Sequence, residues 1–289
     1  MKYGNYLSPV CILVLLLGLS DPAAIRAQEH DFQPVHWAYS SIFGTGWYQL
    51  DGNRSVFVLR MPPRQTLRQS SITDSGERKL GVEINYPVTV GLHSIDDLQE
   101  IISPDNFGTI SFTPGVGLEI PVNKRWYLRP FANFGWGTEK DSDDSAWIYY
   151  AGIKSRYTFP GRKFDWSLLN GIYYAGYTPN SGRAESLAAA QLGVGFRRPL
   201  NNATLFGRAL DLNWHVIYSF LGEEIDFGLP DGKFDPVKDQ FEIGVAVSFR
   251  DQPYEFWFFK INYLGLGYQF TPDGRFEAIT FSMRSWFKK

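Results

Sequence analysis

The alternation that decides the fold runs from Leu80 to His93, in the sequence LGVEINYPVTVGLH. Every even position carries an apolar or aromatic side chain, and every odd position carries Gly, Glu, Asn, Pro, Thr or His. Successive side chains of a β-strand point to opposite faces of the sheet. The segment therefore predicts one long strand with an apolar face and a polar face.

The same two-residue period continues along most of the chain. The expected strands are 36–50, 55–61, 80–93, 110–120, 126–137, 146–156, 166–178, 187–198, 206–220, 241–249, 255–270 and 278–287. An even number of strands, here about twelve, is typical of bacterial outer-membrane barrels. Many of these segments have about ten residues or more, which suits a tilted membrane crossing better than the ~5–6 residues usual in soluble sheets.

The connections between these strands also alternate in length, as they do between the two ends of a membrane barrel. The long, outer connections are expected at 94–109, 138–145, 179–184, 221–240 and 271–277. The short, inner turns are expected at 121–125, 159–163, 199–205 and 251–252. The segment Pro62–Lys79 is too long for an inner turn. Either the first two strands are misassigned, or this segment folds inside the lumen or in the periplasm.

Composition narrows the class of protein. The 289 residues are 17% aromatic, yet their mean hydropathy is −0.22. A chain so rich in aromatic residues is not intrinsically disordered, and no apolar run of about 20 residues after the first 27 supports a helical membrane protein. The net charge of −2 gives no support for nucleic-acid binding.

Tryptophan and phenylalanine gather near the ends of the expected strands, as in the aromatic girdles of membrane barrels. We expect the following residues at the membrane interfaces: Trp126, Trp136, Trp147, Trp166, Trp257, Trp286 and Phe287. In a soluble β-sandwich the apolar faces pack on each other and connection lengths need not alternate. The sequence thus favours an all-β, transmembrane, antiparallel up-and-down β-barrel of about 12 strands.

The first 27 residues have the three parts of a secretory signal peptide. Lys2 supplies the positive charge, Val10–Leu19 the apolar stretch, and small residues lead to Ala27. We therefore expect a cleaved signal peptide at 1–27 and an outer-membrane barrel domain at 28–289. Cleavage removes Cys11, the only cysteine, so no disulfide or thiol chemistry is expected.

Two segments, Phe112–Pro121 and Arg125–Gly137, are similar to part of the autotransporter translocator barrel, in which a strand with a Leu-x-Pro-aromatic core follows a tight turn. The whole chain resembles the solitary outer-membrane autotransporter-like barrels, which have twelve strands and no secreted passenger. Only Gln28–Val35 precede the first expected strand, so no passenger is expected. The resemblance implies location and architecture and no catalytic residue. The strand 278–287 also resembles the C-terminal recognition signal of outer-membrane proteins, although Lys288 and Lys289 follow its final aromatic residue.

The polar faces of the strands are expected to line the lumen. The charged and ionisable residues expected there are Glu83, Glu119, Arg129, Lys154, Arg156, Asp211, His215, Glu242, Lys260 and Arg284. Their mixed signs predict an internal network of ion pairs, or a pore without strong selectivity.

Three of the polar side chains could act in nucleophilic catalysis. Asp211, His215 and Ser219 share one face, but residues four apart on a strand are ~13 Å apart, which is beyond hydrogen-bond reach. We therefore expect no catalytic residue, no cofactor and no metal site.

The expected function is that of an integral outer-membrane protein with a structural, pore-like or surface-interacting role. Its expected partners are outer-membrane lipid, lipopolysaccharide and, during insertion, the barrel-assembly machinery; the oligomeric state stays open. Two alternatives stand beside it: an outer-membrane hydrolase acting on lipid or peptide with His215 as base, and a soluble periplasmic β-protein.

Overall fold

The structure is a computed structural model of the full chain. It separates into two units, Met1–Phe32 and Gln33–Lys289. The residues described are 44–50, 54–92, 108–139, 145–180, 184–228, 234–250, 254–256 and 259–283. The expected signal peptide, the first part of the expected strand 36–50, and the segment 93–107 lie outside these ranges.

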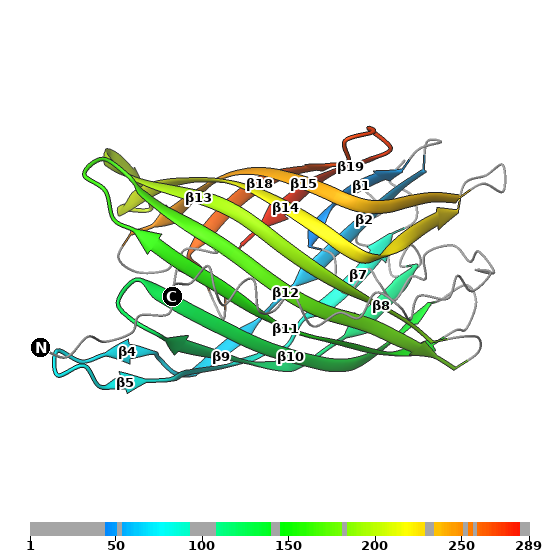
Figure 1. Ribbon diagram of the computed structural model, residues 1–289, viewed down its shortest axis with the longest axis horizontal. Coiled ribbons are helices and arrows are strands. Elements are labelled where there is room, and N and C mark those ends of the chain that lie inside the picture. The colour runs from blue at the N-terminus through cyan, green and yellow to red at the C-terminus, as the bar shows by residue number, and fades with distance from the viewer. Residues whose placement is uncertain are drawn as a thin grey trace, which may run out of the picture. The chain divides into compact units, whose positions relative to one another are not determined.

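Among the described residues, antiparallel strands form one sheet that closes on itself (Figure 1). Its strands are β1 (Thr45–Leu50), β2 (Arg54–Met61), β3 (Arg64–Arg68), β6 (Gly81–Asn85), β7 (Val88–Leu92), β8 (Thr109–Phe112), β9 (Gly115–Pro121), β10 (Trp126–Glu139), β11 (Ser145–Phe159), β12 (Asp165–Pro179), β13 (Glu185–Leu205), β14 (Arg208–Gly228), β15 (Phe234–Phe249), β18 (Tyr263–Phe270) and β19 (Phe276–Ser282). The pairs β2/β3, β6/β7 and β8/β9 each continue one strand, so this part of the chain forms the predicted barrel of twelve strands.

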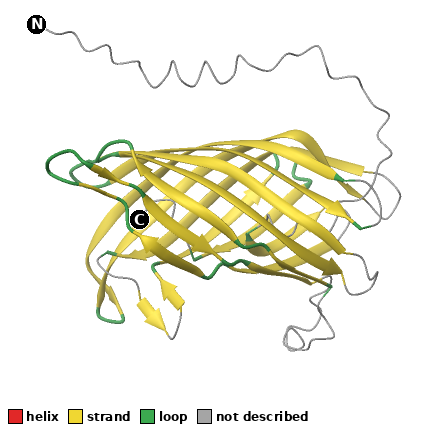
Figure 2. Ribbon diagram, turned by 90° about the horizontal axis from the view of Figure 1, so that it is seen from below, coloured by secondary structure: helices red, strands yellow, loops and turns green. Residues whose placement is uncertain are grey.

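The barrel closes through the pairing of β1 with β19, which joins the first described strand to the last. The first two strands are therefore correctly predicted where they are described. The end of the barrel that carries the connection 122–125 is here called the turn end, and the opposite end, which carries the connection 271–275, is called the loop end. In Figure 1 the turn end is on the left. Figure 2 shows that the described wall is built almost entirely of strand.

Prolines interrupt three neighbouring strands at the same level. The predicted strand 80–93 breaks at Pro87, the predicted strand 110–120 breaks at Pro114, and Pro62–Pro63 separate β2 from β3. Proline has no backbone N–H to donate to the ladder. The carbonyls of Pro63, Pro87 and Pro114 still accept hydrogen bonds from the next strand, with N–O distances of 2.8, 3.1 and 3.0 Å. The wall is thus creased here but stays continuous.

The long connection Pro62–Lys79 is explained by this crease. Beyond it, β3 pairs with β6, and the chain then forms a small hairpin of β4 (Ser71–Ile72) and β5 (Arg78–Lys79) at the turn end. Figure 1 shows this hairpin at the lower left. The segment is an extension of the barrel wall rather than a turn, and the strand on either side of it belongs to the barrel.

Three other boundaries differ from the prediction. Residues 199–205, which were expected to form a turn, continue β13 instead. The turn consists of Phe206 and Gly207, whose φ angles of 52° and 72° are those of a two-residue hairpin turn with both residues in the left-handed conformation. The expected loop 221–240 is largely strand, since β14 and β15 still pair at Ile225 and Val237.

The expected strand 255–270 divides in two. Only β18 belongs to the barrel, while β16 (Tyr254–Phe256) and β17 (Phe259–Ile261) pair with each other in a separate two-stranded sheet. The expected turn 251–252 lies outside the described ranges.

Burial follows the predicted alternation. On β14 the odd residues from 211 to 221 are buried, including Asn213 at 0% exposure, while Val216 on the other face is 46% exposed. Many polar residues are therefore interior, and the exposed surface is largely apolar. The interior also holds a buried apolar cluster that includes Val58, Ile148 and Phe276. Among the residues that the structure describes, no helix is long and apolar enough to span a membrane.

Candidate functional site in the barrel lumen

Charged side chains meet inside the barrel near its turn end. On β10, Arg129 donates hydrogen bonds from Nε (2.7 Å) and Nη2 to the carboxylate of Glu119 on β9, and Ser70 donates to the same carboxylate. On β13, Arg197 Nη2 donates to Asp165 Oδ2 on β12 at 2.5 Å. We call these five residues the turn-end cluster. In this cluster the predicted lumen residues Glu119 and Arg129 form an ion pair with each other, so neither charge is left inside the barrel without a partner.

Two further cations of β11 point into the same region. Lys154 lies directly opposite Arg129 in the β10–β11 register, and its ammonium is 5.8 Å from the centre of the Phe131 ring. Arg156 lies over the ring of Tyr127 at 5.4 Å. Both are cation–π contacts, in which the negative ring face stabilises the cation.

A second cluster lies at the middle of β14 and β15. His215 Nε2 is 2.8 Å from Glu242 Oε1, and Gln269 Nε2 on β18 donates to Glu242 Oε2 at 2.8 Å. We call these three residues the His215–Glu242 network. Lys154 is close enough for its charge to act on Glu242. The His215 side chain is only 6% exposed, whereas the Glu242 side chain is 24% exposed.

Glycine makes the space for this network. The imidazole of His215 lies against Gly244, where an added Cβ would overlap the ring. A Cβ at Gly267 would be 2.5 Å from Thr280 Oγ1 and 3.2 Å from Glu242 Oε1. The two inward-facing glycines thus allow large polar side chains from neighbouring strands to meet without pushing the wall apart.

Arg60 is a charged lumen residue that the sequence did not single out. Its Nη2 donates to Tyr150 Oη on β11 at 2.5 Å, although three strands of the wall separate β2 from β11. The contact therefore crosses the lumen rather than following the sheet. The sequence also did not single out Arg64, which pairs with Glu83 at 3.3 Å. Both arginines were missed because the faces of the strand 55–61 and of the following segment were not assigned.

The structure does not bring Asp211, His215 and Ser219 together. Asp211 accepts a hydrogen bond from Arg250 Nε at 2.9 Å, and Ser219 accepts one from Gln191 at 3.2 Å. His215 is instead oriented by Glu242, on the neighbouring strand, which strand pattern alone does not pair with it. His215 Nδ1 has no hydrogen-bond partner among the described residues.

Two of the expected lumen residues are not placed in the barrel wall. Lys260 belongs to the separate β16–β17 hairpin, so its assignment to a barrel strand is wrong. Arg284 lies outside the described residues. Within the described ranges no group of three His, Cys, Asp or Glu side chains is arranged to hold a metal ion.

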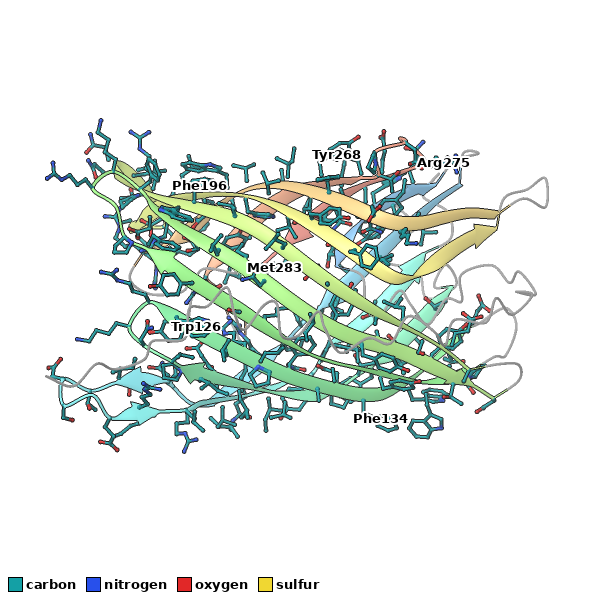
Figure 3. The ribbon with its side chains drawn as sticks, viewed as in Figure 1. Trp126, Phe134, Phe196, Tyr268, Arg275 and Met283 are labelled. Carbon is teal, nitrogen blue, oxygen red and sulfur yellow. The ribbon has the colours of Figure 1, made fainter. Side chains whose placement is uncertain are left out.

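Aromatic side chains project from the outer surface near both ends of the barrel. At the turn end, Trp166 stacks on Phe159 with ring centres 3.9 Å apart, and Trp126 Nε1 donates to Ser155 Oγ at 2.9 Å. Phe196 stacks on Trp214 at 5.4 Å in the same region. Figure 3 shows Phe196 at this end, on the upper left.

At the loop end, Trp136 and Trp147 are opposite each other in the β10–β11 register and are 45% and 48% exposed. Phe134 stacks on Trp147 at 5.2 Å and projects outward at the lower right of Figure 3. Strand β11 carries aromatic residues toward both of its ends. Tyr149 and Tyr157 are eight residues apart on it, which corresponds to about 26 Å along the strand at ~3.3 Å per residue. Trp257, Trp286 and Phe287 lie outside the described residues.

A closed antiparallel barrel with an apolar exterior and a charged interior defines the class of transmembrane β-barrels. Among solved structures, the chain is similar to the β-domain of the Bordetella autotransporter BrkA, with a TM-score of 0.51 and 12% identity over 82% of this chain and 94% of that one. No protein-family model matches the sequence, and no curated protein matches it. The autotransporter-type barrel fold predicted from the two segments between Phe112 and Gly137 is thereby confirmed.

Proposed function

We propose that this protein is an integral, non-enzymatic β-barrel of the bacterial outer membrane, exported by the signal peptide predicted at 1–27. The observation that carries the proposal is the exterior of the barrel. An apolar surface lies between two aromatic girdles, and the closed wall leaves its backbone groups paired, which is the condition for a sheet in lipid.

The lumen supports a structural or pore-like role. Cations and carboxylates from six or more strands are paired inside it, and Arg60 reaches Tyr150 across it. Twelve strands enclose more space than the eight whose side chains just fill an interior. We infer that the ion-pair network braces this wider barrel and sets which small solutes enter it.

A hydrolase built on His215 is the rival. Glu242 supplies an orienting carboxylate at 2.8 Å, but the described residues place no hydroxyl within hydrogen-bond distance of either ring nitrogen of His215. A base needs such a nucleophile or a path for substrate water. We therefore assign His215 a bracing role. In assays of phospholipid and peptide hydrolysis, activity that is lost in His215→Ala would overturn this assignment.

Fractionation of a Gram-negative host tests the membrane proposal. We expect the protein in the outer membrane, resistant to extraction by alkaline carbonate, and migrating faster on SDS gels before heating than after, as closed barrels do. The proposed partners, lipid and lipopolysaccharide, should copurify with it under mild detergent. Recovery from the soluble periplasm without detergent would refute the proposal and favour the soluble β-protein.

A further inference from the structure

We propose that the turn end of the barrel binds the headgroups of anionic phospholipids through exposed basic side chains that lie just beyond its aromatic girdle. We call these side chains the basic rim; they are Arg125, Arg162, Lys163 and Arg198, and all four are exposed. The inference rests on the proposed function, because it needs the barrel to stand in a bilayer, and it names the lipid class that meets one end. Lipid binding by the folded barrel in detergent can be measured independently of membrane location.

The aromatic girdle at the turn end crosses the outer faces of five neighbouring strands, β10 to β14. Its members are Trp126, Tyr157, Phe159, Trp166, Phe196 and Trp214. The rings of Tyr157 and Phe159 are 4.7 Å apart, and stacking continues from Phe159 to Trp166. Figure 3 labels Trp126 and Phe196 of this girdle. Because amphipathic rings of this kind lie at the level of the lipid headgroups, the girdle fixes where the bilayer ends on this side.

The basic rim lies further from the membrane centre than the girdle. Since β10 to β14 are consecutive and antiparallel, the connections 122–125 and 160–164 both lie at the turn end. Arg198 follows Phe196 by two residues on the same face of β13, which is about 7 Å along the strand at ~3.3 Å per residue. Each headgroup layer of a bilayer is about 5–8 Å thick. The rim therefore falls at the depth of the lipid phosphates.

A contact between aromatic rings joins parts of the rim into one surface. Phe164, in the turn 160–164, is 43% exposed, and its ring centre lies 5.9 Å from that of Phe196, edge to face. The turn between β11 and β12 thus reaches over to β13. This places Arg162 and Lys163 on the side of the turn that leads to Arg198, so one anionic headgroup can meet basic groups from two segments.

Acidic side chains of the described residues do not pair with the rim. Asp165, which follows the turn 160–164 directly, instead accepts a hydrogen bond from Arg197 at 2.5 Å inside the barrel. Lys124 is not counted in the rim, because it lies 3.9 Å from Asp74. The rim therefore offers exposed positive charge to a ligand outside the barrel.

The loop end presents a different arrangement of charge. In the turn 271–275, Arg275 pairs with Asp273 at 3.5 Å. The exposed carboxylate of Glu277 accepts a hydrogen bond from Tyr268 on the outer face. A carboxylate at this level repels an anionic headgroup, so the turn end is the favoured end.

The side of the membrane selects phospholipid as the anion. In bacterial barrels the short turns face the periplasm, so the rim would meet the periplasmic leaflet, and lipopolysaccharide belongs to the other leaflet. Three of the four rim cations are guanidinium groups, whose planar donors match the oxygens of a phosphate. Each Lys or Arg near an anionic membrane surface strengthens binding about fivefold.

The test is a titration of the purified, delipidated barrel in detergent micelles with phosphatidylglycerol, followed by native mass spectrometry, which counts the bound lipid molecules. Arg162→Gln/Lys163→Gln removes two cations of the rim. Arg78→Gln/Lys79→Gln is the matched control, because it removes two exposed cations from the hairpin β4–β5, outside the strands that carry the girdle. We expect affinity to fall about tenfold or more in the first variant and by less than about twofold in the control.

Phosphatidylcholine is the control lipid, because it shares the acyl chains and the phosphate but has no net charge. The wild type should bind phosphatidylglycerol about fivefold or more tightly than phosphatidylcholine, and high salt should remove this preference. Heat-dependent migration on SDS gels shows which variants are folded.

Equal phosphatidylglycerol affinity in the wild type and the folded Arg162→Gln/Lys163→Gln variant would overturn the proposal. So would a wild type without preference between the two lipids, or a variant that loses lipopolysaccharide binding more than phosphatidylglycerol binding. Any of these results in a protein that fractionates with the outer membrane would leave the proposed function standing. Recovery from the soluble periplasm would instead refute the proposed function itself.

Discussion

The turn-end cluster and the His215–Glu242 network are both built from polar side chains inside one barrel, yet they differ in the burial of their basic side chains and in how tightly the wall packs around them. In the cluster, Arg129 and Arg197 are 23% and 34% exposed. In the network, His215 is only 6% exposed although Glu242 is 24% exposed, and inward-facing glycines fit around the imidazole. We therefore expect the network to depend more on close packing than the cluster does.

The largest loss of stability should follow from removing the carboxylate of the His215–Glu242 network. Glu242→Ala leaves His215 and Gln269 without their shared acceptor in a buried site, which costs about 3–5 kcal/mol for a broken buried pair. Urea unfolding of the barrel in lipid vesicles measures it. Glu77→Ala, on the exposed β4–β5 turn, is the control and should change stability by less than about 0.5 kcal/mol. Equal effects of the two variants would remove the distinction between the regions.

A smaller loss should follow from filling the space that glycine leaves. Gly244→Ala places a methyl group against the His215 ring, and overpacking of this kind costs about 1–3 kcal/mol. Gly117→Ala is the matched control, because Gly117 is an inward glycine of β9 with open space at its Cβ position. The same urea unfolding should show a loss only for Gly244→Ala, and a comparable loss in both variants would contradict the packing argument.

The turn-end cluster should lose less stability on substitution, because its arginines are partly exposed. Glu119→Gln weakens the ion pair with Arg129, at a cost of about 1–2 kcal/mol. The same urea unfolding should therefore show a smaller loss for Glu119→Gln than for Glu242→Ala. An equal or larger loss for Glu119→Gln would contradict this ranking.

The smallest effect is expected outside the lumen, in the loop-end turn 271–275. A hydrogen bond from Thr271 Oγ1 at 2.5 Å lowers the pKa of the Asp273 carboxyl, and Thr271 Oγ1 in turn accepts from the Phe276 amide at 3.1 Å. Because the folded pKa is lowered, this contribution is present at neutral pH and is lost as the pH falls through the folded pKa.

Hydrogen exchange of the Phe276 amide, corrected for intrinsic rates, checks this turn. Its protection should decrease in acid in the wild type and should be low and independent of pH in Asp273→Asn. Protection in the wild type that does not change between neutral and acidic pH would contradict the relay. The exchange of the amides around His215, which lie in the middle of the wall, serves as a reference.

Alternation alone was enough to predict the barrel, the number of its strands and the faces of most of them, because period-two burial is a local property of each strand. The proline crease was visible at Pro87 and Pro114, but its alignment across three strands depends on register. Pairs such as His215 with Glu242 and Arg60 with Tyr150 join residues from different strands. Their geometry is set by closure and register, which a single sequence does not show.

The most direct test of the account compares two neighbouring residues of β13 that face opposite sides of the wall. Leu192 is 56% exposed on the apolar exterior, and Gln191 points into the lumen, where it bonds to Ser219. Spin labels at Leu192→Cys and Gln191→Cys, in a Cys11→Ser background in lipid bilayers, report contact with oxygen, which is soluble in lipid, or with a water-soluble nickel complex. The account predicts that the label at 192 meets oxygen far more than nickel and that the label at 191 does not. A label at 192 that meets mainly the nickel complex would contradict a membrane-spanning barrel.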